Sequence, residues 1–302
     1  MKRPSRQSKV LPIAEAVRQF VRPGALVAVG GMHMHNNPMA LIREVIRQRI
    51  PIGTLMTGGA GGLNADLLIG AGLVAEVLTC YVGFEYLGLA PRFRQGVEAG
   101  GLRVREVDEA FVLLALRAGA HGSPFMPYPA GMGVQEFARV NPRDYQRVTD
   151  PFTGEQVWAA RAAVPDVALV HAQLVDPFGN AAFLGSLFAD REMILAARHT
   201  VLQADAVVSP LAVRRAGGTG LPGFLFAAVV EAPYGCHPTS SHGRYLHDEA
   251  HLQAYLGLKG QEEFEAYLKV HVLDPEGPAA YARSVGGRRH LASLREAGRR
   301  RR

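Results

Sequence analysis

The sequence is poor in the features that mark disulfide-stapled, membrane-spanning and repetitive proteins. Its 302 residues include only two cysteines, Cys80 and Cys236, which are too few for a disulfide scaffold and favour a reduced compartment. No apolar run approaches the roughly 18 residues of a membrane span. The apolar stretch after the basic start is broken by Pro12, Glu15 and Arg18, so it is a poor signal-peptide core. We therefore expect a globular, cytoplasmic protein that does not enter a membrane.

The positive charge of the chain is confined to its two ends. The net charge is +6, yet residues 287–302 alone carry +6 and residues 1–9 carry +4, which leaves −4 on residues 10–286. A nucleic-acid groove needs a basic surface on the folded body, and this body is mildly acidic. We expect no nucleic-acid partner. We also expect a flexible basic N-terminus over 1–9, one domain over 10–286 and a frayed basic tail over 287–302.

Glycines cluster where two predicted strands end. The strand at 25–29 runs into Gly30 and Gly31, and the strand at 52–58 runs into Gly58, Gly59, Ala60, Gly61 and Gly62. Glycine lets a backbone approach a ligand closely, and ligands of open α/β sheets bind at the carboxyl ends of the strands. The pattern indicates a site of backbone N–H groups for an anionic or acyl ligand, although tight turns between strand and helix would give the same pattern.

Strand-like and helix-like segments alternate along the chain. The strand-like segments continue at 78–82, 102–107, 164–173, 200–205 and 224–233, and the helix-like segments lie at 38–48, 108–120, 190–199 and through 247–284. Asp108 stands where a helix N-cap belongs, and a loop rich in Pro and Gly is expected at 123–133. This alternation predicts a single α/β domain with an open, mostly parallel sheet and helices on both faces.

Five sequence landmarks occur in a fixed order across roughly residues 8–285. They are ALVAVGG with PMALIREVIRQ, GTLMTGGAGG, ADLLIGAGLVAEVLTCYVG, VPDVALVHAQLVDPFGN and VVEAPYGCHP. In content and order they resemble the alpha subunits of family I coenzyme A transferases, most of all those of the glutaconate CoA-transferases. The resemblance implies the CoA-transferase/isomerase-like fold. Sugar-phosphate isomerases and sensor domains of the DeoR type share such a fold, and a noncatalytic scaffold stays possible, since fold does not fix function.

The resemblance also implies a reaction and a partner. Members of the family move CoA from an acyl-CoA to a small carboxylate by ping-pong chemistry, with a glutamate as nucleophile. In two-subunit members this glutamate lies in a Ser-Glu-Asn-Gly type motif of the beta subunit. No such motif occurs in this sequence, and Phe84-Glu85-Tyr86 is only the nearest candidate. We expect an alpha subunit that requires a beta subunit, takes coenzyme A as substrate and holds no permanent cofactor.

The resemblance places the expected binding residues on the two glycine loops. These are Gly30, Gly31, Met32 and His33 on the first loop and residues 58–62 on the second. Asn36 and Asn37 precede the helix at Pro38, where capping is their favoured role. Transferases of the family usually carry glutamine where this chain has Glu109. That residue is a protonated donor, a general base of a ring-opening CoA-ester hydrolase, or a first-turn residue that favours the helix dipole.

The remaining histidines and cysteines give weaker signals. His237, His242, His247 and His251 lie close together in sequence, but their spacing fits no familiar zinc motif, so we expect no metal. Cys80 lies in a strand pattern and is expected to be an inert core thiol.

Overall fold

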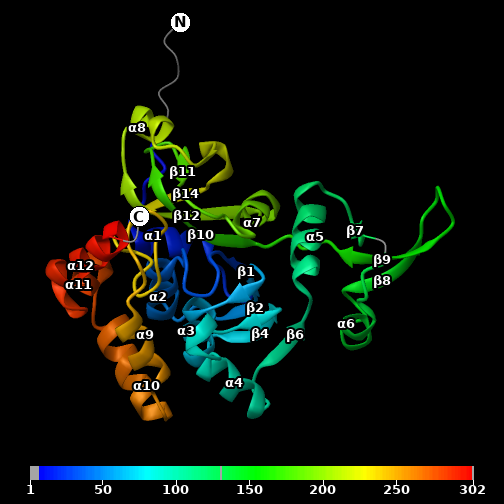
Figure 1. Cartoon of the computed structure of the whole chain (residues 1–302), viewed down its shortest axis with the longest axis horizontal. Coiled ribbons are helices and arrows are strands. Elements are labelled where there is room, and N and C mark those ends of the chain that lie inside the picture. The colour runs from blue at the N-terminus through cyan, green and yellow to red at the C-terminus, as the bar shows by residue number, and fades with distance from the viewer. Residues whose placement is uncertain (1–6, 130, 301–302) are drawn as a thin grey trace, which may run out of the picture.

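The central sheet contains seven parallel strands in the order β14–β12–β10–β1–β2–β4–β6 (Figure 1). The computed structural model describes residues 7–129 and 131–300. The parallel strands are β1 Leu26–Val29, β2 Ile52–Thr57, β4 Val74–Thr79, β6 Arg103–Glu106, β10 Val167–Val175, β12 His199–Val207 and β14 Ala228–Glu231. Antiparallel β11 (Ala181–Phe183) and β13 (Thr219–Leu221) extend the sheet beside β10. The predicted mostly parallel α/β sheet is confirmed.

Alternating side chains of the strands enter two hydrophobic cores, one on each face of the sheet. Val27 and Leu55 belong to one core, whereas their neighbours Ala28 and Met56 belong to the other, as the two-residue period of a strand requires. The first core is covered by α1 Ile13–Phe20, α2 Met39–Arg47, α3 Leu63–Gly70, α4 Pro91–Glu98, α9 Glu249–Leu256 and α10 Gln261–Leu268. The second is covered by α5 Glu109–Ala120 and α7 Asp190–Ala196. Helices therefore cover both faces, as predicted.

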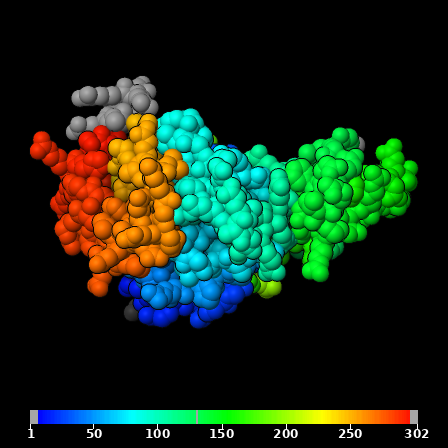
Figure 2. Space-filling view, turned by 90° about the horizontal axis from the view of Figure 1, so that it is seen from below, coloured from blue at the N-terminus to red at the C-terminus, as the bar shows by residue number. Residues whose placement is uncertain are grey.

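A small lobe stands away from the body after α5, and it is the green end of the molecule in Figure 2. It consists of β7 Phe125–Pro127, α6 Gln135–Val140, β8 Tyr145–Thr149 and β9 Gln156–Arg161, with the strands antiparallel in the order β7–β9–β8. The prediction that 123–133 is only a loop is wrong at β7, because this strand pairs with β9. The sequence of β7 is short and contains Pro127, so its strand character depends on that pairing.

The C-terminal segment is not frayed over its described part. Residues 287–300 form helix α12 (Gly287–Arg300), which follows α11 (Gly277–Ser284). Leu291 is 1% exposed and packs with Tyr281 and Val285. The prediction of a frayed tail is therefore corrected, because apolar residues between the arginines give this helix a face to bury. At the other end, Lys9 Nζ donates to the carbonyls of Gly223 and Phe226, and residues 1–6 lie outside the described part.

Three short elements lie outside the seven parallel strands and the lobe. The pair β3 (Ala60–Gly61) and β5 (Tyr81–Val82) forms a two-stranded parallel ladder at the carboxyl edge of the main sheet. A helix α8 (Pro210–Arg215) precedes β13. Among the described residues, none of the helices has the length and apolar character needed to cross a bilayer.

Candidate functional site

The two glycine loops lie against each other at the carboxyl ends of β1 and β2. The Asn64 side chain joins them: its Nδ2 donates to the Gly30 carbonyl at 3.0 Å, and its Oδ1 accepts from Gly62 N at 2.9 Å. A Cβ on Gly62 would lie 1.9 Å from the His33 carbonyl oxygen, so only glycine fits there. The structure thus brings together the segments 30–33 and 58–62 that the sequence predicts as one site.

Most N–H groups of these loops already have acceptors within the chain. Gly30 N donates to Leu169 O at 2.8 Å, Gly31 N to Asp190 Oδ1 at 2.9 Å and Met32 N to His35 O at 3.0 Å. The prediction that these three donors hold an acyl oxygen is therefore corrected, because each is engaged in shaping its own loop. Ala60 and Gly61 pair with β5.

The N–H groups of Gly58 and Gly59 differ from those of the first glycine loop. Within residues 7–129 and 131–300 their N–H groups make no hydrogen bond. Donors without an internal partner at this edge are suited to an oxyanion, and one such donor is typically worth about 3 kcal/mol in a transition state. The binding site that the structure leaves available therefore centres on the Gly58-Gly59 corner.

Glu109 lies at this corner. It is the first residue of α5, its side chain is exposed, and it makes no hydrogen bond or ion pair with the described residues. A Cβ on Gly59 would lie 3.1 Å from Glu109 Oε1, and the φ of +112° at Gly59 also favours glycine. The structure thus places the Glu109 carboxylate beside the second glycine loop, a neighbour that the sequence did not indicate.

Asp108 fixes the position from which Glu109 projects. Its Oδ1 accepts from Phe111 N at 2.9 Å, which confirms the predicted N-cap of α5. Its Oδ2 accepts from the hydroxyls of Tyr128 and Tyr145 in the lobe, at 2.9 and 2.8 Å. Burial, together with the Asp108 charge, raises the pKa of both tyrosines, so the hydroxyls remain donors. The lobe is in this way tied to the start of the helix that presents Glu109.

Two ionisable groups beside the site have strongly raised pKa values. Burial raises the pKa of Cys80 to about 12, and the charges of Glu109 and Asp108 add to the rise, so the thiol stays protonated as an inert thiol should. Asp190, the first residue of α7, is 1% exposed, and burial raises its pKa to about 7 although Gly31 N donates to it. Sequence reasoning missed Asp190, since nothing in its neighbourhood along the chain points to the first glycine loop.

The residues that follow Gly31 turn sharply and contact other loops. His33 and Asn36 have positive φ angles of 49° and 55°. His35 Nδ1 lies 2.8 Å from Ser240 Oγ and its Nε2 lies 3.3 Å from Glu85 Oε1, while burial lowers the His35 pKa. Neither Asn36 nor Asn37 caps α2, which corrects that prediction. Asn36 Oδ1 accepts from Gln173 Nε2 instead.

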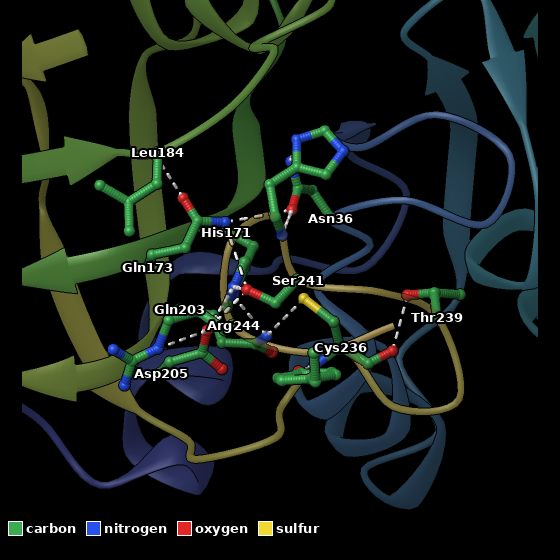
Figure 3. A network of polar contacts seen from close by, with 12 residues as sticks. Asn36, His171, Gln173, Leu184, Gln203, Asp205, Cys236, Thr239, Ser241 and Arg244 are labelled. Atoms are coloured by element: carbon green, nitrogen blue, oxygen red, sulfur yellow. Dashed lines mark hydrogen bonds and ion pairs between the residues drawn. The ribbon is translucent and has the colours of Figure 1, made fainter. Parts of the chain in front are cut away.

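A buried polar network beneath these loops was not found from the sequence (Figure 3). His171 Nε2 lies 3.0 Å from Ser241 Oγ, and that hydroxyl donates to Asp205 Oδ2 at 2.6 Å. The three residue types suggest a nucleophilic triad, but Ser241 is fully buried and donates directly to the carboxylate. The network instead holds the 236–245 loop on β10 and β12. Its signal in the sequence is the polar residues inside two otherwise apolar strands.

A second cluster of histidines surrounds Asp248 near the C-terminal helices. Ligand atoms of His237, Asp248 and His251 lie within 4.8 Å of one another. His237 Nε2 and His290 Nε2 lie 3.0 and 2.6 Å from Asp248 Oδ2. Burial lowers the pKa of His237 and His251, and the charge of the buried Arg43 guanidinium, which donates to the His237 carbonyl, lowers both further. A metal cation bound at this cluster would therefore be repelled by the positive charge of Arg43.

The chain has clear relatives among known proteins. The profile of the family described as Coenzyme A transferase matches residues 10–232. The chain is 31% identical over 299 residues to the A-type subunit of glutaconate CoA-transferase from Acidaminococcus fermentans, and the match covers 93% of both chains. The crystal structure of that enzyme superposes with a TM-score of 0.87 over 95% of each chain.

Two further relatives carry other chemistry. The cholesterol ring-cleaving hydrolase IpdA subunit of Rhodococcus jostii is 32% identical over 267 residues, covering 83% of this chain and 87% of the relative. A crystal structure of a variant of the decarboxylase AibA/AibB superposes with a TM-score of 0.77 at 31% identity, covering 88% of this chain and 100% of that chain.

The open, mostly parallel sheet is the architecture that this chain shares with glutaconate CoA-transferase. The chain belongs to the coenzyme A transferase family, and within it to the CoA-transferase subunits of the A type.

Proposed function

We propose that this chain is the alpha subunit of a heteromeric CoA-transferase, and that a beta subunit supplies the nucleophilic glutamate. The observation that carries the proposal is the incomplete site: the buried Gly58 and Gly59 have N–H groups without an acceptor among the described residues, next to the exposed Glu109 side chain, and the sequence has no nucleophile motif of the family's type. Coenzyme A is a substrate, no resident cofactor or metal takes part, and the complex works in the cytoplasm.

The proposed chemistry divides one exchange into balanced steps. The partner's carboxylate attacks the thioester carbonyl, and CoA leaves as the thiolate, which gives an acyl anhydride. The thiolate then attacks the glutamyl carbonyl, and the first carboxylate leaves. The acceptor carboxylate repeats the two steps in reverse. Gly58 N and Gly59 N stabilise the oxyanion that develops at each addition.

The position of Glu109 supports a second candidate, a CoA-ester hydrolase. An exposed carboxylate without an internal partner, next to the same donors, is suited to activate a water molecule as general base. In the transferase, by contrast, the negative charge of Glu109 only changes the electrostatic potential at the partner's carboxylate. The IpdA relative is named a hydrolase, so both activities occur among proteins similar to this chain.

Glu109→Gln separates the two candidates. The chain is co-purified with its stoichiometric partner, and the complex is assayed for CoA transfer and for release of free CoA. For a transferase we expect the variant to keep transfer within about fivefold, because glutamine retains the shape and adds a donor. For a hydrolase we expect a loss of about 10²- to 10⁴-fold.

The exposed Glu136 in the lobe serves as the matched control, and Glu136→Gln is expected to leave both activities unchanged. Release of free CoA without transfer in the wild-type complex, reduced more than about 10²-fold in Glu109→Gln, would contradict the proposed transferase. Transfer catalysed by the chain purified alone would contradict the role of the partner.

A further inference from the structure

A largely apolar cavity of about 450 Å³ opens next to the candidate site. It lies between α4 and the ends of β4 and β6, at the edge of the main sheet. Its apolar walls are Tyr81, Val82, Leu89, Phe93, Val97 and Val104. The volume falls within the roughly 300–1,000 Å³ that small-molecule sites occupy.

Cys80 connects this cavity to the catalytic corner. It lines the cavity, its N–H donates to Gly59 O at 3.2 Å, and its thiol feels the charge of Glu109. The cavity therefore begins next to the loop where the thioester carbonyl is proposed to bind. Because the thiol stays protonated, Cys80 contributes a neutral and weakly polar wall.

The charges around the cavity disfavour an acyl group with a distal carboxylate. Arg94 is the cation at the rim, and its Nε already donates to Glu98 Oε1 at 2.8 Å. Glu106 also lines the cavity and adds a negative charge. A second carboxylate on the acyl chain would enter an apolar space flanked by two glutamates, and the cation that lines the cavity, Arg94, is solvent-exposed with its charge already paired with Glu98.

We propose that this cavity receives the acyl group of the thioester, and that the substrate class is an acyl-CoA with an extended apolar acyl chain. The inference rests on the proposed function, since it takes the Gly58-Gly59 corner as the position of the reacting carbonyl. It goes further by selecting apolar acyl chains over short chains and over dicarboxylic ones.

The test uses the complex with its partner and three thioesters: butyryl-CoA, octanoyl-CoA and glutaryl-CoA. Octanoyl-CoA is expected to have the highest kcat/KM, about tenfold or more above butyryl-CoA, because each buried methylene favours binding. Val97, 42% exposed on α4, is then changed to arginine, which places a charge at the cavity without emptying the core. Val97→Arg is expected to lower kcat/KM about tenfold or more for octanoyl-CoA and to lower it less for butyryl-CoA, so that the preference for octanoyl-CoA is lost.

Val140→Arg is the matched control, because Val140 is 55% exposed and lies on α6 in the lobe. It is expected to change neither substrate. Equal kcat/KM for octanoyl-CoA and butyryl-CoA, unaffected by Val97→Arg, would overturn the inference while leaving the proposed function intact. A Val97→Arg chain that folds but no longer retains its partner would overturn it as well, because the partner would then cover the cavity.

A binding measurement separates this inference from the proposed reaction. Calorimetry compares S-octyl-CoA with S-butyl-CoA, which are thioethers that cannot react. Tighter binding of S-octyl-CoA, lost in Val97→Arg, supports the cavity even if the complex neither transfers nor hydrolyses CoA esters. Equal binding of the two thioethers in a complex that does turn over acyl-CoA rejects the cavity alone.

Discussion

At the scale of single residues, two carboxyl groups near the same loops experience opposite surroundings. Glu109 is exposed and without an internal partner among the described residues, so it is available to a substrate or a partner. Asp190 is buried, its pKa is raised to about 7, and its one described side-chain hydrogen bond comes from Gly31 N. Asp190 therefore shapes the first glycine loop, whereas the side chain of Glu109 is exposed beside the second one.

The raised pKa of Asp190 predicts a pH-dependent stability. Between about pH 4 and 7 Asp190 is protonated in the folded protein and ionised in the unfolded chain. The free energy of unfolding therefore falls as the pH rises through this range, and the loss is complete above the folded pKa of about 7. Asp190→Asn keeps an acceptor for Gly31 N and removes the titration. Relative to the variant, the wild type should lose up to about 3 kcal/mol of unfolding free energy between pH 5 and 8.

Urea unfolding at pH 5 and pH 8 measures this difference. The exposed control Glu136→Gln should show no comparable dependence. A difference between the wild type and Asp190→Asn that stays the same at both pH values would show that Asp190 ionises normally in the folded protein.

At the scale of elements, α2 depends on a residue far away in the sequence. The helix begins after Pro38 without a side-chain cap from its own neighbourhood. Gln203 on β12 supplies the acceptor instead: its Oε1 accepts from Ala40 N at 3.0 Å and from Leu41 N at 3.2 Å. Orphan N–H groups at a helix start must find such partners, and here the sheet beneath the helix provides them.

We expect Gln203→Leu to lower the free energy of unfolding by about 1–3 kcal/mol. The substitution leaves the buried Leu41 N without an acceptor, whereas Ala40 N keeps its hydrogen bond to the Gly235 carbonyl at 2.9 Å. Chemical denaturation measures the loss, and Gln253→Leu on the exposed surface of α9 is the control, with an expected change below about 0.5 kcal/mol. Equal stability of the two variants would contradict the capping role of Gln203.

At the scale of the whole molecule, the basic C-terminal segment is part of the folded body over its described residues. Leu291 is buried against α11, and His290 Nε2 lies 2.6 Å from Asp248 Oδ2. The charge of this segment is therefore carried on a packed helix. At the opposite end of the molecule, the lobe is joined through Asp108 to the start of α5.

Removing residues 287–302 should therefore destabilise the protein by about 2–4 kcal/mol, comparable to the loss of a buried leucine. Thermal or chemical unfolding measures this change. The double variant Arg288→Ala and Arg289→Ala is the control, since both side chains are exposed and their removal changes charge with little loss of packing. A truncated chain as stable as the full one would show that α12 does not stabilise the body.

Much of the fold was predictable because its signals are local. The alternation of apolar segments gave the order of strands and helices, the Asp108 cap marked the start of α5, and five ordered landmarks pointed to the family. The lobe was less predictable. Its strand β7 is three residues long and includes Pro127, so its strand character comes from pairing with β9 and not from its own sequence.

The candidate site was predictable in position but not in detail. Its two glycine loops and Glu109 were identified from the sequence as candidates. The hydrogen bond from Gly31 N to Asp190 was not. Gly31 meets Asp190 across 159 positions of the chain, and Gln203 meets Ala40 across 163. Sequence patterns report on near neighbours, so contacts over such separations leave no local signal.

The sequence by itself determined the βα order, the glycine-lined edge and the family, because helix period, strand period and glycine conformation act over a few residues. The tertiary structure alone decided which backbone donors stay available, which carboxyl group is buried and which is exposed, and where an apolar cavity adjoins the site. These properties depend on which distant side chains pack into the space beside each loop, and burial and hydrogen bonding are set by those neighbours.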